Sequence, residues 1–192
     1  MVYKFKNSAR FEKLKTTRRG PDKNYVSGWG HYRSAPVMCK LIKDFGVKSF
    51  VEVGACGCQL SETILFEFPD VKVFSVDVTF TENRTRAGQR IQAPIAKMKK
   101  EFGDRFEAIE LPSLEAVKKF KDRSLDMVYI DALHTYDAVK ADIYAWSKKL
   151  HGGSILSGHD YNHGQNPGVK KAVDEIFKKV NLEDYFNWWK IH

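Results

Sequence analysis

The sequence predicts an α/β fold: a doubly wound, mainly parallel sheet of six or seven strands with helices on both faces. Short apolar, β-branched runs alternate with longer segments of helical spacing, which is typical of a parallel sheet. These runs lack the period-two alternation of a half-exposed strand, which indicates strands covered on both sides. Polar and ionisable residues follow the runs, where a parallel sheet gathers its strand ends at one edge.

The predicted elements follow from local signals along the chain. Ser34 and Pro36 suit the N-cap and first turn of a helix that Gly46 closes, and Pro69 ends the next helix. The pair Gly152-Gly153 is expected to end the helix that begins near Thr135, and residues 79–90 read as a long polar loop. The predicted strands are 49–54, 71–76, 106–110, 125–130, 154–156 and 185–191. The predicted helices are 34–45, 59–68, 91–102, 112–120, 135–150 and 167–180.

Length and composition favour one globular domain in a reducing compartment. The chain has 192 residues, of which 43% are hydrophobic and 29% charged, so it can build one core without disulfides. No apolar run approaches the ~20 residues of a membrane span, and no secretory signal is visible. The three cysteines are an odd number, and Cys56-x-Cys58 lacks a second pair of zinc ligands. We therefore expect a cytoplasmic protein that does not enter a membrane.

The positive charge is concentrated near the N-terminus. Residues 1–24 hold eight Lys or Arg against Glu12 and Asp22, a net charge of +6 (8 − 2) out of +8 for the chain. We therefore divide the chain into a basic N-terminal arm, residues 1–33, and a domain, residues 34–192. Such an arm could contact nucleic acid, an acidic surface or an anionic substrate, and a solvated leader is the alternative.

Chemically active side chains follow the predicted strands at the carboxyl edge of the sheet, where ligands bind in open α/β folds. Grouping polar residues there costs solvation free energy unless a ligand or an ion compensates, so this edge is the predicted site. The residues at this edge, in strand order, are Glu52, Gly54, Ala55, Cys56 and Gly57; Asp77; Leu111, Pro112 and Ser113; Asp131 and His134; and His159, Asp160, Tyr161 and Asn162.

The turn after the first strand, Glu52-x-Gly54-x-x-Gly57, lets the backbone approach a ligand closely at a helix N-terminus. It is not the G-x-G-x-x-G fingerprint of dinucleotide-binding proteins, and a purely structural tight turn is the alternative. Asp77 lies 25 residues after Glu52, at the end of the second strand. A carboxylate in that place can accept both hydroxyls of a ribose.

Three segments carry a resemblance to a known family. VEVGACGCQLSE, FSVDV and LDMVYIDALHTYDAVKADIYAWSKKLHGGSILSGHDY resemble the class I S-adenosylmethionine-dependent methyltransferases, which have a Rossmann-like fold. Within them the chain is similar to the metal-dependent O-methyltransferases of catechol and of macrolide sugars. The resemblance covers about residues 34–192, and its specific part is 125–161. The first turn departs from the common E-x-G-x-G-x-G, because Cys56 and Cys58 stand where glycines are usual.

For the cofactor, the resemblance implies one role for each position. Gly54, Ala55 and Gly57 would face the methionine part of S-adenosylmethionine, in a turn organised by Glu52. Asp77, followed by Val78, would hold the ribose. Pro112 and Ser113 would lie beside the adenine, and Asp131 would come close to the cofactor as well.

For catalysis, the resemblance implies that Asp131 and Asp160 ligate a divalent metal such as Mg²⁺. The third ligand would be His159 or Asn162, or the protein supplies none. His134 would be the general base, acting together with Asp131. The chemistry is consistent, since two carboxylates suit a hard cation and histidine accepts protons near neutral pH. Alternatives stay open: Asp131 contacts the cofactor or caps a helix in metal-free relatives, and His134 could cap a helix or hydrogen-bond to Asp160.

The resulting expectation is O-methylation of a hydroxyl on a small molecule or sugar. Assistance by a divalent metal ion, bound by the two aspartates, and a metal-free reaction stay open as alternatives. Arg84, Arg86 and Arg90 in the 79–90 loop favour an anionic substrate. The short chain offers little material to cover a substrate, which suggests an open site or a second chain in an oligomer. The alternatives are a nucleic-acid or protein methyltransferase that uses the basic arm, and a non-catalytic binding module with the same fold.

Overall fold

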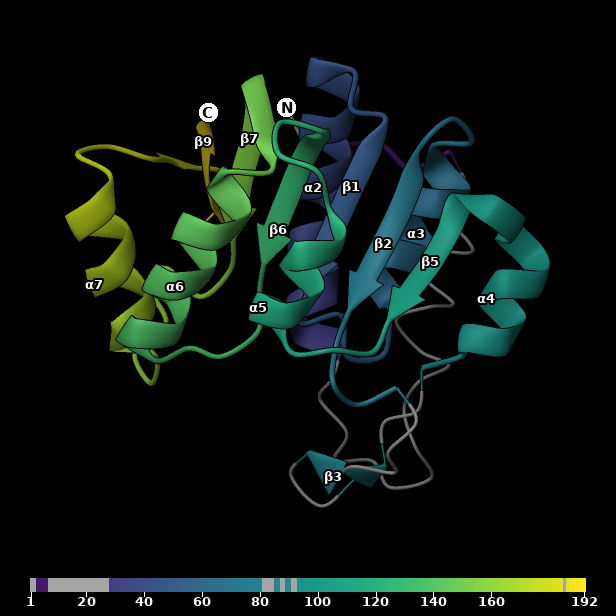
Figure 1. Ribbon diagram of the computed structural model, residues 1–192, viewed down its shortest axis with the longest axis horizontal. Coiled ribbons are helices and arrows are strands. Elements are labelled where there is room, and N and C mark those ends of the chain that lie inside the picture. Colours follow the sequence, from purple (N-terminus) through teal and green to yellow (C-terminus); the bar gives the residue numbers. More distant parts are fainter. Residues whose placement is uncertain (1–2, 7–27, 81–84, 87–88, 91–92, 185) are drawn as a thin grey trace.

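The computed structural model describes residues 3–6, 28–80, 85–86, 89–90, 93–184 and 186–192. Within them lies a seven-stranded sheet in the order β5-β2-β1-β6-β7-β9-β8, with helices on both faces, so the predicted α/β class is confirmed (Figure 1). The pairs β5-β2, β2-β1, β1-β6 and β6-β7 are parallel, whereas β9 is antiparallel to both β7 and β8. The seventh strand, β8, has two residues, which explains why the sequence left the strand count at six or seven.

The strands of this sheet are β1 (Ser49–Val53), β2 (Lys72–Val76), β5 (Phe106–Ile109), β6 (Leu125–Ile130), β7 (Leu150–Gly158), β8 (Asn181–Leu182) and β9 (Trp188–Ile191). A separate pair is formed by β3 (Thr85–Arg86) and β4 (Gln89–Arg90). The helices are α2 (Gly28–Phe45), α3 (Gln59–Glu67), α4 (Ile95–Phe102), α5 (Ser113–Ala116), α6 (Tyr136–Ser147) and α7 (Pro167–Ile176). Short 3₁₀ turns follow α4 (Gly103–Arg105) and α5 (Val117–Lys119).

Two hydrophobic cores lie on the two faces of the sheet. Phe50 of β1 and Met127 of β6 pack with α2, α3 and α4 on one face, while Val51 and Val128 pack with α5, α6 and α7 on the other. All four side chains are fully buried. Burial of one such side chain contributes about 1.5–3 kcal/mol, so both faces of each central strand have to be apolar. This double coverage is the reason that the strands lack period-two alternation.

Helix α2 begins at Gly28, six residues before the predicted start at Ser34, and Pro36 lies inside it. An interior proline costs a helix about 3 kcal/mol. Most side chains that follow on α2 are buried, including Met38, Leu41 and Ile42, and their burial outweighs that cost. The predicted arm boundary at residue 33 therefore falls within a helix.

The Gly152-Gly153 pair was expected to end a helix but lies inside β7, so that prediction is wrong. Helix α6 ends earlier, at Ser147. The pairing of β6 with β7 shifts from Leu125–Leu150 to Met127–Ile155, and Gly153 has a φ of +91° at this irregularity. Glycine is needed there to form a bulge in the strand.

Smaller differences concern the ends of other elements. Helix α4 begins at Ile95, helix α7 ends at Ile176, and the last predicted strand is confined to β9 with β8 before it. The predicted 79–90 loop contains β3 and β4, and Arg84 lies outside the described residues. Most of the basic arm, residues 7–27, lies outside them as well. No helix in the described segments is long and apolar enough to span a bilayer.

The carboxyl ends of β1, β2, β5, β6 and β7 meet at one edge of the sheet, because these strands are parallel. Figure 1 shows the arrowheads of β2, β5 and β6 pointing to this edge, with β3 beyond it. The predicted site residues follow these five strands. The fold therefore gathers residues that are far apart in the sequence at one edge.

We predict that Tyr129→Phe lowers the free energy of unfolding by about 1–3 kcal/mol. The buried Tyr129 hydroxyl lies 2.7 Å from Ser34 Oγ and 3.1 Å from Asn187 Oδ1, so its loss leaves buried polar atoms without a partner. Urea unfolding measures the change. Tyr144→Phe is the control, since the Tyr144 side chain is 53% exposed. Equal midpoints for the two variants would contradict the prediction.

Candidate active site

The turn after β1 packs directly against the loop after β6. Gly54 has a φ of +91°, and a Cβ placed on it would lie 2.1 Å from the carbonyl oxygen of Asp131. Its N–H and that of Ala55 both donate to the carbonyl of Val76 at the end of β2 (2.8 and 3.1 Å). Glycine at position 54 is therefore required by the backbone contact itself, before any cofactor is considered.

In this turn, cysteines occupy two positions, 56 and 58, at which the family pattern has glycine. Cys56 and Cys58 have φ values of 47° and 56°, in the left-handed region that L-residues disfavour by roughly 1–2 kcal/mol. Neither is joined in a disulfide within the described residues, and Cys58 is buried whereas Cys56 is partly exposed. Helix α3 starts one residue later, at Gln59, and Gly57 is buried between the two cysteines. The two cysteines therefore adopt the left-handed conformation that usually favours glycine.

Asp77 joins the end of β2 to this turn. Its Oδ2 accepts a hydrogen bond from the Cys56 N–H at 2.7 Å, and its Oδ1 accepts from the N–H and hydroxyl of Thr79 at 2.9 and 2.6 Å. The carboxylate is only partly buried, and Oδ2 has a further lone pair, whereas Oδ1 already accepts two hydrogen bonds. Asp77 is therefore fixed in orientation and can still accept a hydroxyl group through Oδ2. The next side chain, Val78, is 39% exposed at the same edge.

Glu52 is buried behind the turn. One carboxylate oxygen accepts from the N–H and the hydroxyl of Ser61 on α3, at 3.1 and 2.5 Å, and the Ser61 hydroxyl lies 2.6 Å from that of Ser75 on β2. Burial raises the pKa of Glu52 to about 8, aided by the charge of Asp131, although the Ser61 hydrogen bonds oppose the shift. Glu52 therefore links β1 to α3 through Ser61.

Ser113 at the start of α5 is held by α6. Its hydroxyl donates to Asp142 Oδ1 at 2.6 Å and accepts from Trp146 Nε1 at 2.9 Å. The neighbouring Pro112 is exposed at the same edge of the sheet. The Ser113 hydroxyl thus fixes the loop between β5 and α5 to α6. The sequence analysis did not assign Asp142 or Trp146 to this contact with the β5–α5 loop.

Asp131, His134 and Asp160 come together at the ends of β6 and β7. His134 Nε2 lies 3.2 Å from Asp131 Oδ1 and 3.1 Å from Asp160 Oδ2. The N-cap of α6 is Thr135, whose hydroxyl accepts a hydrogen bond from the Ala138 N–H. Of the two alternatives for His134, the structure therefore shows the contact with Asp160 and not the helix cap. Because carboxylates only accept hydrogen bonds, Nε2 of His134 carries a proton in this arrangement.

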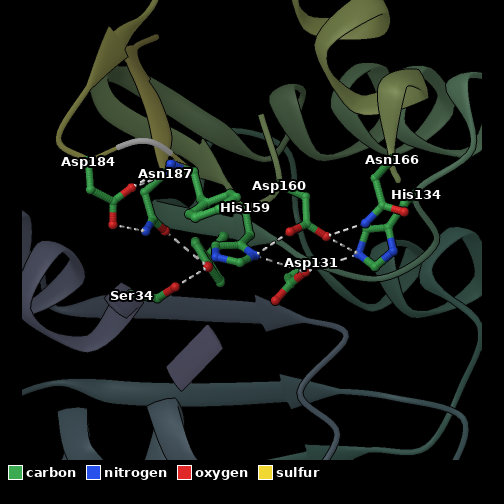
Figure 2. A network of polar contacts seen from close by, with 10 residues as sticks. Ser34, Asp131, His134, His159, Asp160, Asn166, Asp184 and Asn187 are labelled. Atoms are coloured by element: carbon green, nitrogen blue, oxygen red, sulfur yellow. Dashed lines mark hydrogen bonds and ion pairs between the residues drawn. The ribbon is translucent and has the colours of Figure 1, made fainter. Parts of the chain in front are cut away.

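Asp160 is the most strongly held of the three. Figure 2 shows it between two imidazoles: His159 Nδ1 lies 2.9 Å from Oδ1, and Asn166 Nδ2 donates to Oδ2 at 2.7 Å. Its φ of 59° places the carboxylate by means of an unusual backbone conformation. Burial opposes ionisation, but the contacts with His159, His134 and Asn166 lower the pKa of Asp160 to about 2. Asp160 is therefore a buried anion.

His159 supports Asp160 from the side opposite His134. Its Nδ1 lies 3.9 Å from Asp131 Oδ1, farther than from Asp160. Its ring packs on Phe186 with centroids 5.7 Å apart, and no hydrogen-bond partner of its buried Nε2 is found among the described residues. Burial disfavours the charged ring, yet the Asp160 hydrogen bond and the charge of Asp131 raise the pKa of His159.

The three clustered side chains suit a divalent cation. One ligand atom from each of Asp131, His134 and Asp160 lies within 4.8 Å of the others. Carboxylates are typical ligands of Mg²⁺ and Mn²⁺, whereas an imidazole favours a transition metal over Mg²⁺. His134 is the third member of this cluster, and the roles of His159 and Asn162 as a third metal ligand stay predictions. Asn166 was missed, and its position before Pro167 at a helix start was the one available signal.

We predict that Gly54→Ala lowers the free energy of unfolding by at least about 2 kcal/mol, because the methyl group collides with backbone atoms of residues 131 and 132. Cys56→Gly should instead raise it by up to about 1 kcal/mol, since glycine removes the left-handed strain. Thermal and urea unfolding measure both. The two substitutions should therefore change the free energy of unfolding in opposite directions. An unchanged stability of Gly54→Ala would show that the loop after β6 moves to accommodate the methyl group.

Glu52→Gln should change how stability depends on pH. In the wild type the unfolded carboxyl ionises near pH 4.5, whereas the folded one stays protonated until about pH 8. The contribution of Glu52 to stability is therefore present below pH 4.5 and is lost as the pH rises to 8, by a few kcal/mol. Glutamine cannot ionise, so the free-energy difference between variant and wild type should shift in favour of the variant across this range. Parallel stability curves from pH 4.5 to 8 would contradict the raised pKa.

Comparison with known proteins identifies the family. A family profile described as a methyltransferase domain matches residues 34–161, whereas no curated protein matches the chain. A Staphylococcus aureus structure described as a caffeoyl-CoA O-methyltransferase has a TM-score of 0.68 at 17% identity, covering 95% of this chain and 90% of its own.

Two further structures share the fold. CalS11, a TDP-rhamnose 3'-O-methyltransferase of calicheamicin biosynthesis, has a TM-score of 0.62 at 15% identity, with 96% of this chain and 92% of that chain covered. The Burkholderia thailandensis 1,6-didemethyltoxoflavin N1-methyltransferase, solved with S-adenosylhomocysteine, has 0.59 at 12%, with 96% and 87% covered. The chain belongs to the methyltransferase-domain family and is an S-adenosylmethionine-dependent methyltransferase with the class I fold.

Proposed function

We propose that this enzyme methylates a hydroxyl group of a small molecule or sugar, with Asp131 and Asp160 holding a divalent cation and His134 as the base. One observation carries the proposal: two carboxylates and an imidazole meet at the ends of β6 and β7, next to the turn after β1. Two of the structural neighbours are named as O-methyltransferases, which supports an oxygen acceptor. The neighbour named as an N-methyltransferase makes the acceptor atom the point to test.

The residues present fit S-adenosylmethionine at the turn after β1. The backbone from Gly54 to Gly57, including Ala55, would bind the methionine part, with Glu52 supporting the turn from behind. Asp77, already aligned by the Cys56 N–H, would hold the ribose by accepting a hydroxyl through Oδ2. Val78, Pro112 and Ser113 follow β2 and β5 and would border the adenine, Ser113 through its backbone because its hydroxyl is bonded to Asp142 and Trp146.

The acceptor would lie beside Asp131 and His134. The cofactor supplies an electrophilic methyl group, and a cation held by Asp131 and Asp160 would lower the pKa of the acceptor hydroxyl. Where Nε2 of His134 keeps its proton between the two carboxylates, the ring takes up the acceptor proton at Nδ1. Asp131 and Asp160 then stabilise the imidazolium, as a carboxylate does in a catalytic triad. His159 and Asn166 hold Asp160 in place during this step.

The acceptor is expected to be anionic. Residues 1–24 of the sequence carry a net charge of +6 (8 − 2), and three arginines lie at positions 84, 86 and 90. Arginine binds phosphate and carboxylate groups in a bidentate way. A nucleotide-linked sugar or a carboxylate-bearing small molecule has the required charge.

We predict separate effects for the two halves of the site in a thermal melt with S-adenosylhomocysteine, with Mg²⁺ or Mn²⁺ and with EDTA. A ligand at a hundred times its Kd adds ~2.7 kcal/mol, which is a shift of several degrees. Asp77→Ala should abolish this shift. Asp160→Ala should keep it and lose the additional response to the cation.

Each outcome tests one assignment. An unchanged cofactor shift in Asp77→Ala would refute the ribose role of Asp77. If S-adenosylhomocysteine raises the melting temperature of the wild type but neither the cations nor EDTA changes it, the proposed cation site is refuted. Catalysis would then depend on His134 and the two carboxylates alone. If the folded wild type shows no cofactor shift at all, the proposed chemistry is refuted. Salt-dependent binding of RNA or DNA would instead favour a nucleic-acid acceptor.

A further inference from the structure

The loop that carries Asp131 and His134 is confined between two glycines from different parts of the chain. On one side, a Cβ at Gly54 would lie 2.1 Å from the Asp131 carbonyl oxygen. On the other side, a Cβ at Gly168 would lie 2.5 Å from the Tyr136 nitrogen and 2.8 Å from the His134 carbonyl oxygen. All of these are backbone atoms, so no side-chain rotation could relieve either contact.

Gly168 has no conformational reason to be glycine. It is the second residue of α7, and it is not among the residues with positive φ. Glycine in a helix is less favourable than alanine by roughly 0.5–1 kcal/mol. The close approach of α7 to the loop at residues 134–136 is therefore the physical reason for glycine at this position.

Asn166, two residues earlier, reaches the other half of the cluster. It is the N-cap of α7, yet its side chain makes no capping hydrogen bond. Its amide instead donates to Asp160 Oδ2 at 2.7 Å, the same oxygen that lies 3.1 Å from His134 Nε2 (Figure 2). Asparagine at an N-cap usually bonds to the helix backbone, so this side chain serves Asp160 rather than the helix.

The position of this turn is set by packing away from the site. Val169 and Val173 of α7 are buried in the core shared with α6, and Lys140 of α6 pairs with Glu175 of α7 at 2.6 Å. The Tyr136 hydroxyl also donates to Glu175. The α6–α7 contact therefore fixes where Asn166 and Gly168 lie relative to the loop after β6.

We propose that the Asn166-Pro167-Gly168 turn is a positioning element of the methyl-transfer site. Gly168 sets how closely His134 can lie to α7, and Asn166 sets the orientation of the Asp160 carboxylate, so one turn fixes the His134–Asp160 distance. The inference rests on the proposed function, because it presumes that His134 and Asp160 act together. A displacement of reacting groups by about 1 Å can cost on the order of 100-fold in rate, so such a turn matters for catalysis.

The test compares Asn166→Ala and Gly168→Ala with Gly164→Ala. Gly164 lies on the same connection, and a Cβ there would meet nothing within 4 Å. Long-range ¹H–¹⁵N correlation spectra of the histidine rings report the surroundings of His134, whose signals are assigned by their loss in His134→Gln. We expect the His134 ring signals to shift in Asn166→Ala and Gly168→Ala and to stay unchanged in Gly164→Ala. The melting shift caused by S-adenosylhomocysteine should persist in all three.

Catalysis gives the second readout once an acceptor is in hand. The two positioning variants should lower kcat by about 10- to 100-fold and change KM for S-adenosylmethionine by less than about twofold. The proposal is overturned if His134 signals and kcat in folded Asn166→Ala match those of Gly164→Ala, and this variant decides the matter if Gly168→Ala does not fold. Absence of any cofactor shift in the wild type would refute the proposed function instead, while the ring spectra would still report the positioning.

Discussion

The contact between the turn after β1 and the loop after β6 is the constraint on which the site depends. These two segments leave neighbouring parallel strands, and the Asp131 N–H donates to the carbonyl of Val53 at 2.8 Å. Only glycine at position 54 permits the approach. Because one segment faces the proposed cofactor and the other carries Asp131 and His134, their contact also sets the distance across which a methyl group has to move. A change in packing at Gly54 would therefore alter cofactor binding and catalysis together.

Two buried carboxyl groups at this edge have opposite electrostatic environments. Within the described segments Glu52 receives hydrogen bonds from Ser61 and is close to other acids, so burial dominates and its pKa rises to about 8. Asp160 receives contacts from two imidazoles and an amide, which outweigh burial and lower its pKa to about 2. Near neutral pH one group is mainly neutral and structural, and the other is an anion available to a cation or an imidazolium. The different partners of the two acids thus give Glu52 a structural role and leave Asp160 ionised for the proposed chemistry.

Much of this arrangement could be predicted from local sequence. The apolar runs at 49–54 and 125–130 marked central strands, and Asp77, Asp131 and Asp160 could be placed at one edge because parallel strands end together. The bulge at Gly153, the start of α2 at Gly28 and the glycine contact at Gly168 could not. Each depends on tertiary packing: a glycine in a bulge reads like a glycine at a helix end, and a close backbone approach leaves no local pattern. The bond from Asn166 to Asp160 was missed for the same reason, since Asn166 reads as an ordinary N-cap.

Nε2 of His134 lies beside Asp131 and Asp160, so at this nitrogen a proton and a bound cation exclude each other. This nitrogen lies within 3.2 Å of an oxygen of each carboxylate, and while Nε2 carries a proton it is a hydrogen-bond donor to them. A divalent cation between Asp131 and Asp160 would need Nε2 deprotonated as a ligand, or the ring turned away. Cation binding to Nε2 should therefore move its proton: a neutral ring would carry it on Nδ1, and an imidazolium would release one proton. A base, by contrast, needs a ring nitrogen without a proton, so His134 can act as the proposed base only where its Nε2 is not a ligand of the cation.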